Sequence, residues 1–446
     1  MQTLIWNSLS ETEKRDALSR PAALTQTDII ESVRSIMSDV KAHGDAAVLD
    51  YTARFDGASL TSLKVPNSDL KAAWDALPDA DKDALKSAHK NIQTFHTAQL
   101  PPDIEVETMP GVICRRESRA IDIAGLYVPG GTAPLVSTLL MLAAPARVAG
   151  VQRRIIATPP GKDGKINQAI LAAAYHCQVT DVFACGGAQA IAAMTYGTET
   201  IPACDKIFGP GNAYVAAAKS LAAQIGGGPA IDMPAGPSEA MVVADAKANP
   251  VFVAADLLAQ AEHDTLAQVI CVCDNTDIAK AVTREVESQL FSLPRAKIAD
   301  KALENARIII ANDRSDIADI VNKYAPEHLI LQIDQPRKFV PAIRNAGSIF
   351  LGQWTPESVG DYASGTNHTL PTFGAARAYS GITIESFMKF ISVQELTRSG
   401  LENIGPVVET LATLEGLEAH RRSVSLRLET RPSNKAPNNH KESATS

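Results

Sequence analysis

The fold of this chain is constrained most by a regular alternation of short apolar runs with longer helical patterns, which begins at residue 121. Four apolar runs each precede a segment with helical periodicity: 121–128 before 134–149, 153–158 before 165–176, 180–185 before 188–195, and 205–208 before 212–225. A second series of expected strands follows at 240–244, 268–273, 306–311, 328–332 and 348–351, with helices between them. Such alternation is typical of parallel sheets joined by crossover helices. We therefore expect an α/β protein.

Three loops of the first series place glycines directly before a helix. They read YVPGG at 127–131, GGAQ at 186–189 and GPGN at 209–212. The backbone at such positions can approach a ligand closely, and free N–H groups face an anion. Ligands of open α/β sheets bind at the carboxyl ends of the strands, so a dinucleotide is favoured. The G-x-G-x-x-G fingerprint is absent, however, because Tyr214 stands where its third glycine would be, and glycine turns needed only for chain reversal remain the alternative.

A polar loop follows the last expected strand and is dense in reactive groups. Between Gly360 and His368 it holds a carboxylate (Asp361), an imidazole, an amide and hydroxyls, without an apolar period. A packed core would not accept so many polar groups, so the loop is typical of a functional site. The alternative is a polar turn in which a buried aspartate accepts backbone N–H bonds.

Two shorter motifs carry possible catalytic or metal chemistry. Gln260 and His263 are three residues apart on an expected helix at 249–263, a spacing that places two metal ligands on one face. Glu327 and His328 adjoin at the start of an expected strand, and a near-neutral imidazole beside a carboxylate suits general acid–base work. The alternatives are a histidine that stabilises a helix C-terminus and a histidine hydrogen-bonded to a core carbonyl.

The bulk composition excludes several functional classes. The 446 residues allow two to three domains of ~150 residues, and the net charge of −8 argues against binding to nucleic acid or anionic membranes. No run approaches the ~18 apolar residues of a membrane span, and the first residues lack the basic and apolar regions of a secretory signal. The six cysteines are scattered without a CxxC pair, so we expect reduced, mostly buried thiols in a cytoplasmic protein.

The remaining segments are expected to be mainly helical. Residues 1–100 show mostly helical patterns, Pro110-Gly111 resembles a turn between two extended runs, and helices are expected at about 383–397 and 401–420. The last of these carries Glu415 and His420 near its C-terminal end. The tail 431–446 is rich in Pro, Asn and Ser and is expected to be disordered.

Taken together and in this order, the motifs resemble those of the histidinol dehydrogenase family. The matching stretches cover nearly the whole chain apart from the tail: GLYVPGG (125–131), DVFACGGAQAIAA (181–193), DKIFGPGNAYV (205–215), AIDMPAGPSE (230–239), LLAQAEHD (257–264), APEHL (325–329), GDYASGTNHTLPT (360–372) and EGLEAH (415–420). The resemblance implies a zinc-dependent enzyme that oxidises L-histidinol through L-histidinal to L-histidine in two NAD-dependent steps, the last of histidine biosynthesis.

The resemblance also implies an architecture. It predicts two Rossmann-like parallel-sheet domains with small N- and C-terminal helical segments, in an intertwined homodimer. The domains implied are an N-terminal segment (1–25), a first Rossmann-like domain with the zinc and catalytic motifs (26–126 plus 238–380), a second with the dinucleotide loops (127–237), a dimer-crossing domain (381–430) and the tail (431–446).

Individual roles carry over by position in these motifs. Zinc ligands would be Gln260, His263, Asp361 and, from the other subunit, His420. The NAD contacts would be Tyr127, Gln189 and Asn212. Substrate contacts would be Ser238, His328, His368 and Glu415 together with the zinc ligands. His328 would accept the hydroxyl proton in each oxidation, and Glu327 would activate water to hydrate the aldehyde before the second.

Three other functions stay open on the residues alone. A relative oxidising a different small alcohol would share the zinc and base motifs, although the presence of Ser238, His368 and Glu415 favours histidinol. A zinc hydrolase using Glu327 would have no use for the glycine-rich loops. A non-catalytic binding protein would not need an intact set of zinc and acid–base residues. The metal itself is open too, because Mn²⁺ or Co²⁺ would suit the same donors.

Overall fold

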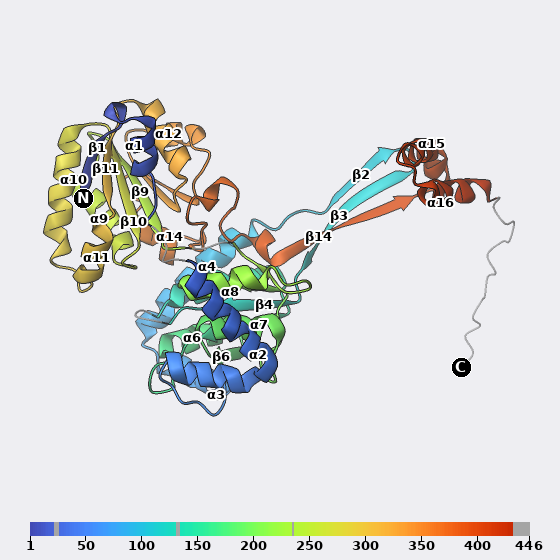
Figure 1. Ribbon diagram of the computed structural model, residues 1–446, viewed down its shortest axis with the longest axis horizontal. Coiled ribbons are helices and arrows are strands. Elements are labelled where there is room, and N and C mark those ends of the chain that lie inside the picture. The colour runs from blue at the N-terminus through green and yellow to red at the C-terminus, as the bar shows by residue number, and fades with distance from the viewer. Residues whose placement is uncertain (22–25, 131–133, 234–235, 431–446) are drawn as a thin grey trace. The chain divides into compact units, whose positions relative to one another are not determined.

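The computed structural model describes residues 1–21, 26–130, 134–233 and 236–430, in two compact units (Figure 1). The first unit comprises Met1–Leu100 and Ala120–Met388, and the second comprises Pro101–Arg119 with the chain from Lys389 onward. Gly131 of the first glycine loop, Pro234 and Ala235 of the DMPAGPSE motif, and the tail 431–446 lie outside the described residues. The expected α/β class is confirmed, and both parallel sheets belong to the first unit.

Six parallel strands form the larger sheet, here called sheet A. Their order is β1 (Gln2–Ile5), β11 (Arg307–Ile310), β10 (Gln268–Cys273), β9 (Glu239–Ala244), β12 (His328–Gln332) and β13 (Ser348–Leu351). The three central strands are buried along their whole length, which explains their nearly continuous apolar sequences. The edge strand β1 lies in a region that was expected to be mostly helical.

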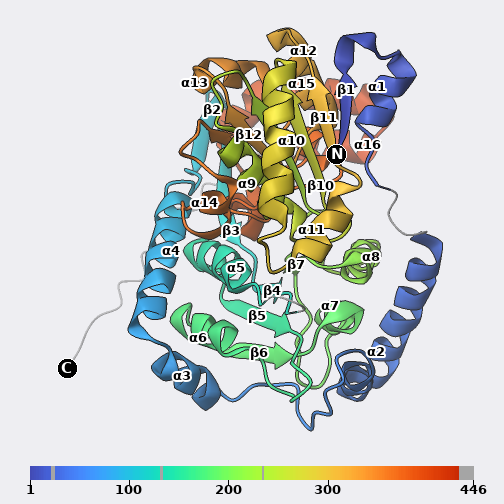
Figure 2. The ribbon, with the colours of Figure 1, turned by 90° about the vertical axis from the view of Figure 1, so that its left-hand side faces the viewer.

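Helices cover both faces of sheet A (Figure 2). One face packs against α9 (Pro250–Ala261), α10 (Thr276–Leu290) and α11 (Ala296–Leu303). The other packs against α1 (Glu11–Ala17), α12 (Arg314–Tyr324) and α13 (Pro336–Phe339). The two side chains Val242 and Val243 show the alternation, since the first faces the α9 layer and the second the α12 layer.

Five parallel strands form sheet B. Their order is β6 (Asp181–Ala184), β5 (Arg153–Thr158), β4 (Ile123–Tyr127), β7 (Lys206–Phe208) and β8 (Ala230–Ile231). Helices α5 (Val136–Val148) and α6 (Gln168–His176) lie on one face, and α7 (Gly187–Tyr196) and α8 (Ala213–Ala222) on the other. All nine strands expected between residues 121 and 351 are therefore present within one or two residues of their expected ends.

Both sheets have the same doubly wound topology. If the strands of each series are numbered along the chain, the order is 3-2-1-4-5 in both, with β1 added at the edge of sheet A. The strand order reverses between β4 and β7 in sheet B and between β9 and β12 in sheet A. These two points are where ligands of such sheets usually bind.

The predicted domain limits need two corrections. Helices α2 (Gln26–Phe55), α3 (Asn67–Ala76) and α4 (Asp79–Thr97) pack against the helices of sheet B, so 26–126 does not group with 238–380. The reason is the apolar stripe of α2, including Val33 and Met37, which is buried with α7 and α8. Residues 2–17 of the predicted N-terminal segment instead supply β1 and α1 to sheet A.

The second unit contains a three-stranded sheet and two helices. The sheet order is β14 (Met388–Leu396), β3 (Val112–Ala120) and β2 (Ile104–Met109), and α15 (Arg398–Leu414) and α16 (Glu418–Glu429) follow. The extended runs around Pro110-Gly111 are confirmed as the antiparallel hairpin β2–β3. The helix predicted at 383–397 is wrong, because most of it is β14, which pairs with β3 and is tied to it by Arg115 and Glu395 at 2.6 Å.

The remaining elements are short. Helical turns occur at Trp6–Ser8, Val340–Ala342, Ala375–Arg377 and Ile384–Phe387, and α14 (Glu357–Tyr362) follows β13. Five of the six cysteines are buried, as expected. Among the described residues, no helix is both long and apolar enough to traverse a bilayer.

Candidate active site

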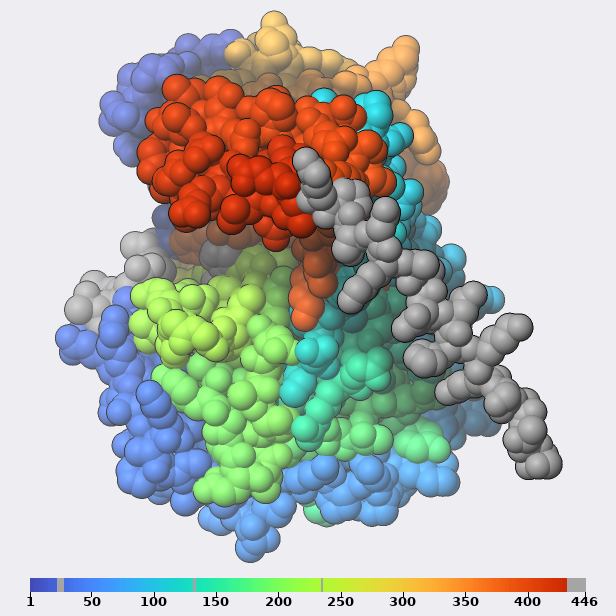
Figure 3. Space-filling view, turned by 90° about the vertical axis from the view of Figure 1, so that its right-hand side faces the viewer, coloured from blue at the N-terminus to red at the C-terminus, as the bar shows by residue number. Residues whose placement is uncertain are grey.

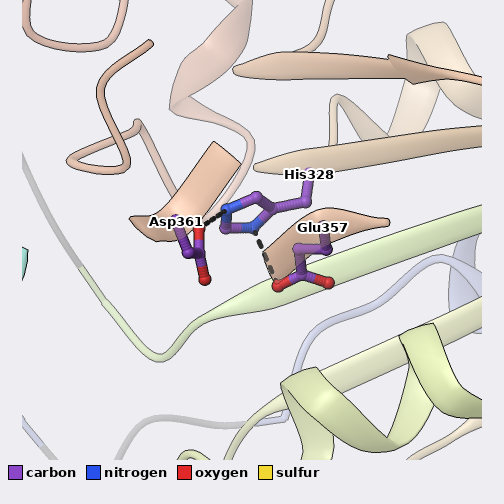
Figure 4. Close-up of side chains that lie close together, drawn as sticks. All are labelled: His328, Glu357 and Asp361. Carbon is purple, nitrogen blue, oxygen red and sulfur yellow. Dashed lines mark ion pairs between the residues drawn. The ribbon is translucent and has the colours of Figure 1, made fainter. Parts of the chain in front are cut away.

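A buried cluster of charged groups lies at the amino ends of the central strands of sheet A. His328 is the first residue of β12, and its imidazole lies between two carboxylates of α14 (Figure 4). Its Nε2 is 3.3 Å from Asp361 Oδ1, and its Nδ1 is 3.8 Å from Glu357 Oε1. The Glu327 carboxylate is 3.7 Å from the same Nδ1. The cluster thus places one base among three acids.

The short helix α14 explains how two of these acids meet one imidazole. Glu357 and Asp361 are four residues apart, so they lie on the same helix face. Gly360 lets the helix approach β13, because a Cβ there would lie 2.5 Å from the Phe350 ring. Asp256 of α9 lies beneath the start of α14, where it accepts a hydrogen bond from Gln332 at 2.8 Å. Helix α9 packs against α14, and Gln260 lies one turn beyond Asp256.

Burial and mutual charge shift the proton affinities in this cluster. Burial raises the pKa of Glu327 to about 8 and that of Glu357 to about 8, although His328 opposes both shifts. Burial would by itself lower the pKa of His328, but the carboxylates of Glu357, Glu327 and Asp361 outweigh it and hold that pKa well above its usual value. The surroundings therefore favour the protonated imidazole, which is the state a general base reaches after it takes a proton.

The backbone of Glu239, the first residue of β9, contacts both members of the Glu327–His328 pair. Its amide donates to Glu327 Oε2 at 2.8 Å, and its carbonyl lies 3.1 Å from His328 Nδ1. This carbonyl requires the proton to be on Nδ1, which leaves Nε2 as the basic nitrogen of the neutral ring. Nε2 is buried and has no hydrogen-bond geometry to any described group, although Asp361 is close. The core-carbonyl alternative thus accounts for one nitrogen only.

The structure brings three of the four expected metal ligands into the first unit. Gln260 is fully buried, and both polar atoms of its amide lack partners. The His263 side chain follows α9 and is exposed, yet partial desolvation by the surrounding protein lowers its pKa, against the opposing charge of Asp361. A second donor group exists among the described residues, because ligand atoms of His328, Glu357 and Asp361 all lie within 4.8 Å of one another.

The expected substrate residues of the first unit surround this cluster. His368 Nδ1 is 2.8 Å from the Asp361 carbonyl, and its Nε2 is 3.1 Å from the Thr138 hydroxyl on α5. Ser238 directly precedes β9, and its carbonyl accepts the Gln268 amide at 3.1 Å. Both residues are half-buried.

The expected cofactor residues lie at the carboxyl ends of sheet B. Tyr127 ends β4, and its buried hydroxyl accepts the Gly187 amide at 3.1 Å, while burial raises its pKa to about 12. Gln189 is buried in the first turn of α7, and the oxygen of its side-chain amide, Oε1, has no hydrogen-bond partner. The Asn212 side chain accepts two amides as the N-cap of α8. Strands β4 and β7 flank the point where the order of sheet B reverses.

A close backbone approach defines this edge of sheet B. Gly209 has φ +118°, and a Cβ there would lie 2.1 Å from the Tyr127 carbonyl oxygen. Its amide donates to Asp232 at 2.8 Å, and its carbonyl accepts from Lys219 at 2.8 Å, two side chains that form a buried ion pair. The start of the loop that carries Asn212 is therefore fixed at both the amide and the carbonyl of Gly209.

Glu415 and His420 belong to the second unit. The expected single helix at 401–420 is broken at Gly416, where φ is +70°, so Glu415 is the C-cap of α15 and His420 lies in the first turn of α16. Both side chains are exposed.

Three residues of the site were absent from the sequence-based set. Glu357 was detectable, because it lies four residues before Asp361 with helical spacing. Thr138 and Glu239 were not, since they act through a contact between distant segments and through backbone atoms, respectively.

Comparisons with known proteins point to one family. The family model described as histidinol dehydrogenase matches residues 19–428. Curated histidinol dehydrogenases from Xylella fastidiosa and Colwellia psychrerythraea are 50% and 47% identical, covering 97% and 96% of this chain and 100% and 99% of their own lengths. The crystal structure of histidinol dehydrogenase from Elizabethkingia anophelis superposes with a TM-score of 0.92 at 46% identity, covering 96% of this chain and 98% of that one.

Proposed function

The chain belongs to the histidinol dehydrogenase family, and from this premise we propose that it oxidises L-histidinol to L-histidine in two NAD-dependent steps at a zinc-dependent site. The observation that carries the proposal is the buried His328, whose Nδ1 is occupied by the Glu239 carbonyl and whose Nε2 is left as a base. When bound, the dinucleotide accepts a hydride in each oxidation, and zinc fixes the amine and imidazole of the substrate.

The donors of the first unit fit a zinc ion. An amide buried without any partner is costly, and the Gln260 amide has neither of its atoms hydrogen-bonded. Gln260, His263 and Asp361 supply the mixed nitrogen and oxygen set that zinc accepts. We assign the ion to these three and to His420 of a second copy. His328 is left out of the set because a nitrogen bound to a metal cannot also accept a proton.

His328 would act as the base of both oxidations. Its Nε2 accepts the proton of the substrate hydroxyl in the first step, while the Nδ1–H bond to Glu239 keeps the ring in place. The acidic neighbours stabilise the imidazolium that results. Release of that proton to solvent returns the base for the second step.

Glu327 would serve between the two oxidations. The aldehyde product must gain a water molecule before a second hydride can leave, and a carboxylate that takes a proton from that water makes it nucleophilic. Glu327 is buried beside His328 and uses one oxygen to bind the Glu239 amide. Its other oxygen remains for the water.

Tyr127, Gln189 and Asn212 support the dinucleotide part of the proposal. They mark the carboxyl ends of β4, β6 and β7, and the first turns of α7 and α8 begin there. Helix N-termini at the reversal point of a parallel sheet suit a pyrophosphate. Gln189 also brings an unpartnered buried oxygen to this edge.

The second unit supports a homodimer with shared sites. Helices α15 and α16, red in Figure 3, expose apolar side chains at a spacing that places them on one helix face, among them Val407, Leu411 and Leu414. Leu417 and Leu426 add to this exposed apolar set. An apolar surface of this kind is typical of an interface, and a second copy that covers it would bring Glu415 and His420 to its partner's site.

NADH production from L-histidinol by the purified chain tests the proposal. We expect close to two NADH for each histidinol consumed, loss of activity on chelation and recovery with zinc. A folded, zinc-loaded chain that forms no NADH from histidinol but does so from another small alcohol would contradict the substrate assignment.

A further inference from the structure

The backbone of Glu239 lies just before the paired part of β9 and β12. Strand β12 begins opposite Ala240, so the amide and carbonyl of residue 239 precede the register of the two strands. Buried backbone groups need partners, and here the partners are the side chains of Glu327 and His328. Any shift of residue 239 would therefore move both side chains together.

The side chain of Glu239 is itself fixed by three donors. Arg20 donates from Nε to one carboxylate oxygen and from a terminal nitrogen to the other, at 2.8 Å for the second. The Phe373 amide donates at 2.9 Å. The Glu239 side chain is 2% exposed and the Arg20 side chain 13%, so this paired fork is almost completely shielded from water.

Arg20 is anchored in turn by the segment that leads to Glu327. Its guanidinium lies 4.1 Å from the centre of the Tyr324 ring and donates to the Tyr324 carbonyl at 2.9 Å. The Tyr324 hydroxyl donates to Gln268, which also binds the Ser19 carbonyl. These contacts form a continuous network that joins the N-terminal segment, β10 and the residues before β12.

We propose that Arg20 and Glu239 are positioning residues for the Glu327–His328 pair. The guanidinium fixes the Glu239 side chain, the side chain fixes the backbone of residue 239, and that backbone orients both catalytic candidates. The inference rests on the proposed function for its kinetic consequence. Its structural part, that Arg20 holds the backbone of residue 239, stands without it.

The test uses full-length Arg20→Met, Arg20→Lys and Glu239→Gln. Misplacement of reacting groups by about 1 Å costs on the order of 100-fold in rate, so we expect Arg20→Met to lower kcat by about this factor. The KM values for histidinol and NAD should stay within about threefold, because the proposed zinc ligands and NAD contacts make no hydrogen bond to Arg20 or Glu239. Arg20→Lys should not restore kcat, since a point charge cannot reproduce the planar fork. Glu239→Gln keeps the contact with the Phe373 amide, so its kcat should lie between those of the wild type and Arg20→Met.

Two further readouts separate positioning from loss of folding. Millimolar methylguanidinium should restore part of the kcat of Arg20→Ala, whereas methylammonium should not. Hydrogen exchange of the Glu239 amide should accelerate in Arg20→Met, while distant strands of sheet A keep their protection.

Arg314→Met is the matched control. Arg314 also lies over an aromatic ring, with its guanidinium carbon 6.0 Å from the centre of Phe339, and also donates to a backbone carbonyl, that of Asp334 at 3.1 Å. Arg314 lies beyond the carboxyl ends of the strands of sheet A, whereas the Glu327–His328 pair lies at their amino ends. The kcat of Arg314→Met should therefore be unchanged.

Wild-type kcat in Arg20→Met would overturn the inference, and so would a loss of kcat in Arg20→Ala that follows the folded fraction and is not restored by methylguanidinium. If the wild-type chain formed no NADH from histidinol, the proposed function would fall, and unchanged exchange of the Glu239 amide in Arg20→Met would separately overturn the positioning role.

Discussion

Glu327 and His328 adjoin in the sequence and are held by the amide and the carbonyl of a single residue, Glu239. Their environments nevertheless differ. His328 has acids on both sides of its ring, whereas Glu327 is raised in pKa mainly by burial. Two titratable groups with such different surroundings suit two different proton transfers.

Glu327→Gln should impair the second oxidation more than the first. The amide oxygen of glutamine can still accept the Glu239 N–H bond, so the loop should persist, but it cannot take a proton from water. We expect turnover of supplied histidinal to fall by about 10²-fold or more, with the first oxidation reduced less. Stopped-flow NADH measurements with histidinol and with histidinal compare the two, and undiminished histidinal turnover would contradict the role.

Asp56 provides a test of stability against pH. One of its carboxylate oxygens is buried without a partner, and burial raises its pKa to about 6. A carboxyl whose folded pKa exceeds its unfolded value of about 3.9 binds its proton more tightly when folded. Its contribution to stability is thus complete below about pH 4 and is lost as the pH rises through about 6.

Asp56→Asn should therefore raise Tm at pH 8 and leave it unchanged near pH 4. Because the residue is partly exposed, we expect a gain of only about 1–2 °C. Thermal unfolding of both proteins across this range checks the sign. Asp50→Asn, on the exposed surface of α2, the helix that ends just before Asp56, is the control. A gain that is largest at low pH would contradict the assignment.

At the scale of elements, the strands that helices cover were predictable from their apolar runs, whereas β14 and β1 were not. Each expected strand of sheets A and B is apolar because helices cover it. β14 is mostly exposed, so its sequence lacks the apolar run that marks a core strand, and a helix was predicted in its place. β1 is four residues long and owes its structure to pairing with β11, a contact that no local pattern encodes.

The loop after β7 gives a prediction at this scale. In Gly209→Ala the new Cβ would meet the Tyr127 carbonyl oxygen at 2.1 Å, so the loop and Asn212 must shift away from β4. We expect the KM for NAD to rise about tenfold or more, with a smaller change in kcat, as is typical of a lost ground-state contact.

Gly227→Ala is the control for backbone strain. Gly227 also has a positive φ, +75°, but no atom lies within 4 Å of the added Cβ. Steady-state kinetics with NAD varied should separate the two variants. Equal KM values in both would show that the close approach of β4 and β7 does not serve the cofactor.

At the scale of the whole molecule, the sequence motifs predicted the two parallel sheets but not the assignment of α2–α4 to sheet B. Helical periodicity shows that a helix has an apolar face, and it does not show which sheet will cover that face. The same limit applies to Glu415 and His420. Their motif suggests a role at the site, while their exposed positions on the second unit leave the role as a proposal.

Complementation between subunits tests that role. His328→Ala and His420→Ala should each be nearly inactive alone. If sites are shared across a symmetric dimer, a mixed dimer has one intact site, and random exchange should restore roughly a quarter of wild-type activity. Activity is measured after reversible dissociation of an equimolar mixture, with subunit exchange verified by two affinity tags. No recovery despite exchange would place His420 in the site of its own chain.

The two sheets share one strand order, but their proposed sites lie at opposite ends of the strands. The expected cofactor residues lie at the carboxyl ends of sheet B, whereas the cluster around His328 lies at the amino ends of β9 and β12. The loops that leave the carboxyl ends of β9 and β12, at 245–249 and 333–335, are consequently remote from the proposed chemistry. An epitope or a fluorescent reporter grafted there would label a working enzyme.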